Sequence, residues 1–259
     1  MEFYPDYLLR LLLVFARVSA LLVAAPFFNN RSIPVRVKVL LGFIVALLLV
    51  AVTPLTLPAQ ATNPVGLIAY LVMEVLTGLL IGFAAQFVFF ALQFASEIIG
   101  FQIGLSLAQV YNPIDGSSAN PLGQLLTFVM VLVFLLLDGH HTVVRALAFS
   151  FEAVPLAGGK VHASGPLLLT WMGQVFITAI QLASPFMITI FLVDASLGIF
   201  ARLVPQAELF QLSLPIKLMG GFVLTILFMP NLFPLFPTFF SRLRDDLYAL
   251  LEALAFGLP

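Results

Sequence analysis

Long apolar runs dominate the chain, and short polar or proline-containing connections separate them. Runs of this length span the roughly 30 Å hydrocarbon core of a bilayer as helices rising 1.5 Å per residue. The pattern therefore predicts an all-α membrane protein with about six hydrophobic, partly broken helical segments that form helical hairpins. We expect these segments at about Asp6–Phe28, Val35–Val52, Val65–Ala108, Leu122–Phe151, Pro166–Leu203 and from about Phe210 onward.

Two of these segments depart from a simple bilayer span. No proline occurs between Val65 and Ala108, so a continuous helix there would reach about 66 Å, twice a bilayer core. This segment either breaks or projects beyond the lipid. The sixth segment contains Pro215, Gly220 and Gly221, and further prolines follow, which predicts a broken element; these are Pro230, Pro234 and Pro237. After it, apolar residues at helical spacing, with charged residues on the opposite side, predict an amphipathic terminal helix toward the C-terminus.

Small and polar residues recur along the third segment at helical spacing. At 100° per residue they fall within about 140° of arc, which makes them one stripe. Small residues allow close approach of helix backbones, and Gln or Glu finds no hydrogen-bond partner in lipid. We therefore expect the stripe to pack against protein, between subunits. Its members are Glu74, Gly78, Gly82, Gln86, Gln93, Glu97, Gly100 and Gly104.

Other charged residues also lie inside apolar segments. Asp6, Arg10 and Arg17 share one helical face, which indicates either snorkelling toward headgroups or contact with another protein. We expect four polar positions to be buried: Arg17, Asp194, Arg202 and Lys217. The carboxylates of Glu74, Glu97 and Asp194 fit a proton or ion pathway and interhelical hydrogen bonding equally well.

A polar group near the middle of the fourth segment predicts a structural cluster. Asp138, His141 and Arg145 lie at i, i+3 and i+7 and share a helical face. The neighbouring His140 points about 100° away from His141 on an ideal helix, and no third ligand stands at a suitable spacing. We therefore expect no metal site.

Composition supports a membrane class and excludes several others. Of 259 residues, 62% are hydrophobic and 9% are charged, compared with about 25% charged in soluble domains. The net charge of −1 offers no basic surface for nucleic acid, and the absence of cysteine excludes disulfides and thiolate metal sites. A signal peptide begins with basic residues, whereas this chain has Glu2 and Asp6 there. We therefore expect the first segment to remain part of the protein and not to be cleaved off.

No enzyme signature is present. Gly104-Leu105-Ser106 lacks the second glycine of the G-x-S-G motif that intramembrane serine proteases carry. The sequence also lacks the H-E-x-x-H motif, the P-loop and the G-x-G-x-x-G motif. No motif therefore supports zinc-dependent proteolysis or nucleotide binding. We expect no catalytic site, no metal and no cofactor.

Three stretches together resemble a known family. They read IIGFQIGLSLAQVYNPIDG, FLLLDGHHTVVRALAFSFEAVPLAGG and DASLGIFARLVPQAELFQLSLPIKLMGG. In order and spacing they are similar to the FliR family of flagellar biosynthesis proteins and its type III injectisome counterparts. The resemblance covers essentially the full chain. Ala207 and Glu208 stand where many flagellar members have an Asn-containing turn, which leaves the injectisome subgroup as an alternative.

The resemblance implies a subunit of the flagellar export gate in the bacterial inner membrane. FliP-like and FliQ-like subunits would be its partners in a hetero-oligomeric helical assembly, with an FlhB-like subunit at the entrance and unfolded proteins as substrates. It implies a FliP-like part at about 1–165 and a FliQ-like part at about 166–259. A self-contained secondary transporter, with midplane carboxylates and broken helices as its substrate site, is the alternative from another class.

The polar loop after the third segment is the most specific site that the resemblance implies. Its composition alone is typical of an ordinary connecting loop. In the family the corresponding loop resembles a plug in the closed channel, and glycine and small polar residues suit a segment that moves aside. The matching positions here are Ser106, Gln109, Tyr111, Asn112, Pro113, Asp115, Gly116, Ser117, Ser118, Asn120 and Pro121.

Overall fold

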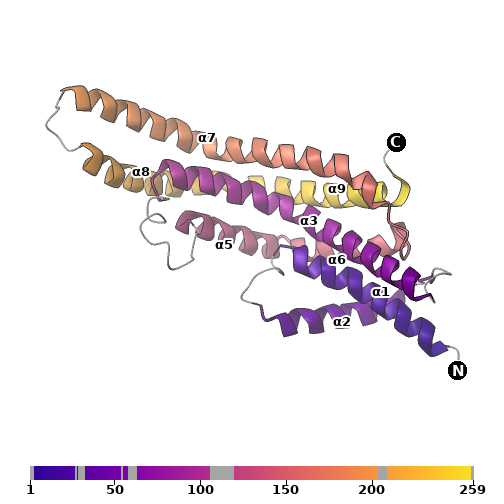
Figure 1. The fold of residues 1–259 in the computed structure, drawn as a ribbon. Coiled ribbons are helices and arrows are strands. Elements are labelled where there is room, and N and C mark those ends of the chain that lie inside the picture. Colours follow the sequence, from indigo (N-terminus) through magenta and orange to yellow (C-terminus); the bar gives the residue numbers. More distant parts are fainter. Residues whose placement is uncertain are drawn as a thin grey trace. The chain divides into compact units, whose positions relative to one another are not determined.

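The computed structural model describes residues 3–26, 28, 33–53, 55–57, 63–105, 120–203 and 209–257. All regular elements within these ranges are helical (Figure 1), which confirms the predicted all-α class. The α-helices are α1 (Phe3–Ala24), α2 (Val35–Val52), α3 (Pro64–Gln102), α5 (Pro121–Leu136), α6 (Gly139–Ala153), α7 (Gly165–Leu203), α8 (Leu209–Leu232) and α9 (Leu235–Phe256), with the 3-10 helix η3 (Val161–Ser164) before α7.

Five of these helices are long and apolar enough to cross a membrane: α1, α2, α3, α7 and α8. The bent pair α5 and α6 raises the number to six if it forms one span. The predicted number of hydrophobic segments is therefore confirmed. The helices α3 and α7 each contain 39 residues, which corresponds to about 58 Å, well beyond a bilayer core.

The predicted fourth segment is two helices instead of one. A bend of 65° separates α5 from α6. Asp138 adopts a left-handed conformation with φ 55°, which breaks the helical path. Gly139 follows, and a Cβ there would lie 2.3 Å from Cδ2 of Phe134, so only glycine fits beneath that ring. The apolar run concealed this break because hydropathy does not report backbone dihedral angles.

The sixth segment is broken later than Pro215, Gly220 and Gly221: α8 ends at Leu232, Pro234 lies in the turn that follows, and α9 begins at Leu235. The helix α8 is continuous and includes both Pro215 and Pro230. A proline removes one backbone hydrogen bond and bends a helix, but neighbouring helices can compensate for this loss in apolar surroundings. Proline content therefore overestimated the disruption within α8.

A glycine ends α3 earlier than the apolar pattern predicts. Gly104 has φ +88°, and the amide of Leu105 donates to the carbonyl of Gly100 at 2.9 Å. This is the Schellman type of C-cap, in which glycine adopts the left-handed conformation at no steric cost. The helix consequently stops at Gln102, and the polar loop begins from a defined end.

The chain forms two compact units that interleave in sequence. The first comprises residues 1–88, 134–172 and 240–259, and the second comprises residues 89–133 and 173–239. In the first unit the amphipathic prediction for the C-terminus is confirmed, because α9 buries one leucine face and exposes Arg242, Arg244 and Glu252. The buried face consists of Leu243, Leu247, Leu250, Leu251 and Leu254.

Glycines let α3 approach α1 closely in the first unit. A Cβ at Gly78 would lie 2.2 Å from the carbonyl oxygen of Arg17, and one at Gly82 would lie 2.7 Å from Cβ of Ala24. Backbone atoms of α1 therefore occupy the space that larger side chains would need. This contact positions the charged groups described next.

Candidate functional site

A fully buried ion pair joins α1 to α3. Nε of Arg17 donates to Oε2 of Glu74 at 2.5 Å, and Nη2 donates to Oε1 at 3.0 Å. The side chains are 0% and 1% exposed. The two parallel hydrogen bonds form the bidentate geometry in which guanidinium and carboxylate interact most strongly.

The remaining polar atoms of the pair have partners at the end of α6. Nη1 of Arg17 donates to the carbonyl oxygens of Ser150 at 2.9 Å and Val154 at 3.1 Å. Carbonyls at a helix C-terminus carry partial negative charge, so they favour a cation. The guanidinium also lies 4.2 Å from the ring centre of Phe151. Oε1 of Glu74 accepts the amide of Ala157 at 2.7 Å.

Part of the predicted charged face of α1 and part of the stripe on α3 lie inside the chain, at this ion pair. Arg17 contacts its own chain, whereas Asp6 is exposed. Glu74, Gly78 and Gly82 likewise lie against α1 of the same chain. This first half of the stripe is therefore occupied within the chain.

The second half of the stripe is mostly at the surface of the chain. Gln93 and Glu97 are exposed, while Gln86 is half-buried and its Oε1 has no partner among the described residues. Gly100 is buried and Gly104 forms the C-cap of α3. Contact with another subunit remains a prediction for the exposed positions.

An asparagine fastens the start of α5 to α3. Asn120 is 1% exposed, and its Nδ2 donates to the carbonyl of Ser96 at 2.7 Å. Its Oδ1 accepts the amide of Leu122 at 3.1 Å, which satisfies a donor in the first turn of α5. A Cβ at Gly100 would lie 1.8 Å from Nδ2 of Asn120, so glycine makes room for the amide.

Of the residues in the predicted loop site, the structure describes two: Asn120 and Pro121. Pro121 is the first residue of α5, where a missing amide hydrogen costs nothing. The other members lie outside the described residues: Ser106, Gln109, Tyr111, Asn112, Pro113, Asp115, Gly116, Ser117 and Ser118. Sequence reasoning grouped Asn120 with the loop and missed its contact with Ser96.

In the second unit an ion pair connects α7 to α8. Nζ of Lys217 lies 2.5 Å from Oδ1 of Asp194. The lysine side chain is 22% exposed and the aspartate side chain is 43% exposed. Arg202 is exposed as well. Within the chain, α7 presents Asp194 and Arg202 outward on a span that is largely uncovered, so their burial against another subunit stays a prediction.

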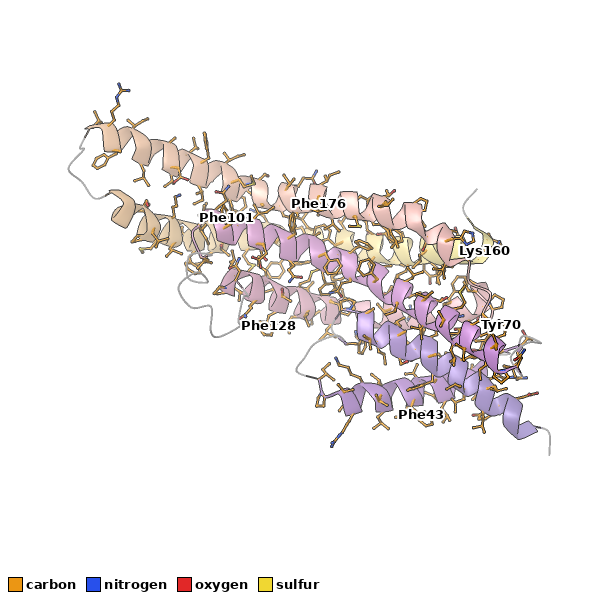
Figure 2. All side chains as sticks on the ribbon, in the orientation of Figure 1. Phe43, Tyr70, Phe101, Phe128, Lys160 and Phe176 are labelled. Atoms are coloured by element: carbon orange, nitrogen blue, oxygen red, sulfur yellow. The ribbon has the colours of Figure 1, made fainter. Side chains whose placement is uncertain are left out.

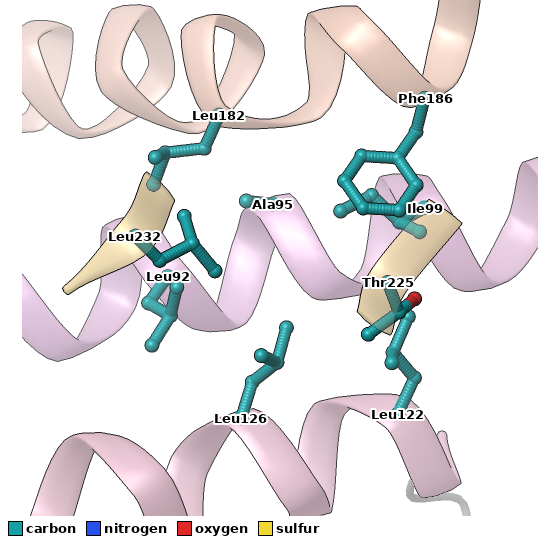
Figure 3. Close-up of a pocket in the computed structure, with 9 residues that line it drawn as sticks. All are labelled: Leu92, Ala95, Ile99, Leu122, Leu126, Leu182, Phe186, Thr225 and Leu232. Carbon is teal, nitrogen blue, oxygen red and sulfur yellow. The ribbon is translucent and has the colours of Figure 1, made fainter. Parts of the chain in front are cut away.

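The second unit also contains an apolar cavity between α3, α5, α7 and α8 (Figure 3). Leu182 and Phe186 reach it from α7, and Leu122 and Leu126 reach it from α5. The hydroxyl of Thr225 is already used, since Oγ1 donates to the carbonyl of Gly221 at 2.8 Å. The cavity therefore offers apolar packing space without polar groups that would orient a substrate.

The polar cluster at the bend differs from the predicted arrangement. Nδ1 of His141 lies 3.0 Å from Oδ1 of Asp138, and the rings of His140 and His141 have centroids 4.1 Å apart. One ligand atom from each of these three residues lies within 4.8 Å of the others. The expected divergence of the two histidines is wrong, since their side-chain rotations bring the rings together. No ion pair joins the exposed Arg145 to this cluster in the described part of the chain.

One acidic group outside the spanning helices has a strongly shifted pKa. Burial, together with the neighbouring charge of Asp245, raises the pKa of Asp246 from 3.8 to about 6. Arg242 and a hydrogen bond from Trp171 oppose this rise. This contact between α9 and α7 was not evident in the sequence, because Asp246 follows the pattern of a solvated face.

These features define a class: a polytopic, all-α membrane protein whose buried charges and glycines hold helices together. Comparison of the sequence with known proteins identifies the family within this class. The model of the family described as "Bacterial export proteins, family 1" matches residues 8–243, and the chain belongs to this family.

Three relatives extend the match over nearly the whole chain, and each is named "Flagellar biosynthetic protein FliR". The protein of Pectobacterium carotovorum subsp. carotovorum is 32% identical, covering 92% of this chain and 89% of that protein. The protein of Escherichia coli K12 is 31% identical, covering 94% and 91%. The protein of Bacillus subtilis 168 is 30% identical, covering 96% of each.

We predict that Arg17→Met lowers the free energy of unfolding by about 3–5 kcal/mol, because it leaves the carboxylate of Glu74 buried without its cation. Combining Arg17→Met with Glu74→Met should restore part of that loss, since no charge then remains buried. Denaturant titration in detergent, followed by Trp171 fluorescence, measures both. Arg145→Met removes an exposed cation and is the control, with an expected change within about 0.5 kcal/mol. A double variant as unstable as the sum of the single variants would contradict this account.

We predict that Asp246→Asn stabilises the protein at pH 8 and has no effect below about pH 4. The folded state raises the pKa of Asp246 to about 6, so the folded state binds the proton more tightly than the unfolded chain. Wild-type stability therefore falls as pH rises from about 4 to 6, and the amide removes that loss. Thermal unfolding midpoints at both pH values test this, with the exposed Glu252→Gln as control. An equal effect at both pH values would rule out titration as the cause.

Proposed function

We propose that the chain is the FliR-type subunit of the flagellar type III protein export gate in the bacterial inner membrane. It contributes to the wall and closure of a channel that exports unfolded flagellar subunits, and it acts without a catalytic site. The observation that supports this most is similarity over at least 92% of the chain to three proteins named for flagellar biosynthesis.

The exposed surfaces support partnership with other subunits. Gln93 and Glu97 on α3, and Gln174 and Gln181 on α7, are exposed on otherwise apolar helices. Such groups lack hydrogen-bond partners in lipid and favour contact with protein. We propose FliP-like and FliQ-like subunits as these partners and an FlhB-like subunit at the entrance. Helices longer than a bilayer core fit an assembly that extends beyond the lipid.

The plug remains part of this proposal and involves residues 106–121. Both ends of this loop start from defined structure: the glycine cap at Gly104 precedes it and the buried amide of Asn120 terminates it. Fixed ends restrict how far a loop can move, so this arrangement suits a segment that opens and recloses. The family resemblance also supports a division into a FliP-like part at about 1–165 and a FliQ-like part at about 166–259, which we propose together with the partners.

We expect the tagged full-length chain to co-purify, in mild detergent, with two other small hydrophobic subunits at fixed stoichiometry. Mass analysis of the intact complex measures this. Gln93→Leu with Glu97→Leu should weaken the complex, because it removes exposed hydrogen-bonding groups; Glu252→Gln on α9 is the control. A chain that is stable, monomeric and active in transport alone would favour the secondary transporter and contradict the gate.

We expect deletion of Asn112–Ser118 to make the membrane leak small solutes, because it removes the segment proposed to close the channel. Deleting Ala59–Thr62, in the connection between α2 and α3, should leave the membrane tight and serves as the control. Uptake of a small dye by cells that produce each variant, compared at equal protein levels, measures the leak. A tight membrane after the first deletion, in a complex that still assembles, would contradict the plug.

A further inference from the structure

The helix α2 is covered on one narrow side. Its buried residues are Gly42 and Ala46, and Gly42 lies against Leu22 and Phe15 of α1. Figure 2 shows side chains that project from α2, with Phe43 labelled among them. Large apolar side chains are exposed along its whole length, among them Val37, Leu40, Phe43, Ile44, Leu48 and Val52.

This surface differs in chemistry from the exposed faces of α3 and α7. After Lys38, α2 carries no side chain that can form a hydrogen bond. The exposed faces of α3 and α7, by contrast, carry Gln93, Glu97, Gln174 and Gln181. A partner helix in an apolar assembly is recognised by small and polar side chains, whereas acyl chains require neither. The uniform surface of α2 therefore favours lipid over protein.

Length and charge point to the same occupant. The 18 residues of α2 span about 27 Å, close to a bilayer core of roughly 30 Å. Arg36 is exposed and Lys38 is half-buried at one end of the helix, and no acidic residue occurs on it. Basic side chains at the end of an apolar span reach the headgroup layer, where they attract anionic lipids.

We propose that α2 is a lipid-facing helix and that Arg36 and Lys38, which point to different sides of its first turn, each contact the phosphate-bearing headgroup of an anionic phospholipid. This assignment does not depend on the export function. It separates the exposed surface of the chain into a lipid contact on α2 and the subunit contacts proposed for α3 and α7.

A single tryptophan reporter tests the proposal. The chain has one tryptophan, Trp171, which is 5% exposed and provides the buried reference. Trp171→Phe combined with Leu40→Trp moves the reporter to a position that is 59% exposed and one turn beyond Arg36. The full-length chain, with any subunits that co-purify, is reconstituted into vesicles of phosphatidylcholine and phosphatidylglycerol. One lipid at a time carries brominated acyl chains, which quench tryptophan fluorescence on contact.

We expect the reporter at position 40 to be quenched strongly and Trp171 to be quenched little. Brominated phosphatidylglycerol should be preferred over brominated phosphatidylcholine by about fivefold for each basic residue engaged. Arg36→Gln with Lys38→Gln should reduce this preference toward one while quenching by phosphatidylcholine persists, which shows that the helix still meets lipid. Circular dichroism verifies that each variant is folded.

Two outcomes would overturn the proposal. Quenching at position 40 as weak as that of Trp171 would mean that protein covers α2. Equal quenching by the two lipids in the parent reporter would refute the anionic headgroup site. Both outcomes are distinct from a failure of the export function, which is read from co-purification.

Discussion

The buried pair of Arg17 and Glu74 is the interaction on which the first unit depends. A guanidinium with no exposed surface is tolerated only if all its donors have acceptors, and here a carboxylate, two carbonyl oxygens and an aromatic ring surround it. The carboxylate comes from α3, whereas the two carbonyl oxygens and the ring come from the C-terminal end of α6 and the residue that follows it. The requirement to compensate one charge therefore fixes α1, α3 and α6 to one another.

Glycine makes this arrangement sterically possible. The carbonyl of Arg17 lies so near α3 that a side chain at Gly78 would collide with it. In the second unit Gly100 has the same relation to the amide of Asn120. In both places a small residue on α3 allows a polar side chain to reach its partner inside an apolar bundle. The stripe on α3 thus serves polar contacts within the chain as well as the proposed contacts between chains.

Membership in the bacterial export family offers an explanation for the polar groups on the exposed surface of this chain. A solitary membrane protein would present apolar side chains to lipid in all directions. Here α3 and α7 expose amides and a carboxylate, while α2 exposes only apolar groups beyond its basic end. The division suits a subunit that meets protein on some helices and lipid on another.

Hydrophobic patterning predicts the all-α class, the approximate spans and the amphipathic C-terminal helix, and the sequence motifs indicate the family. Hydropathy is sufficient for these because each helix in an apolar environment must satisfy its backbone hydrogen bonds internally. Helix ends were less predictable: the break at Asp138 depends on a left-handed backbone conformation, and the continuity of α8 depends on neighbours that tolerate its prolines. The partners of Arg17, Asn120 and Asp246 depend on how the helices pack, which the sequence pattern does not report. These contacts join residues 57, 24 and 75 positions apart, and periodicity reports which face a residue occupies without reporting what another helix brings to that face.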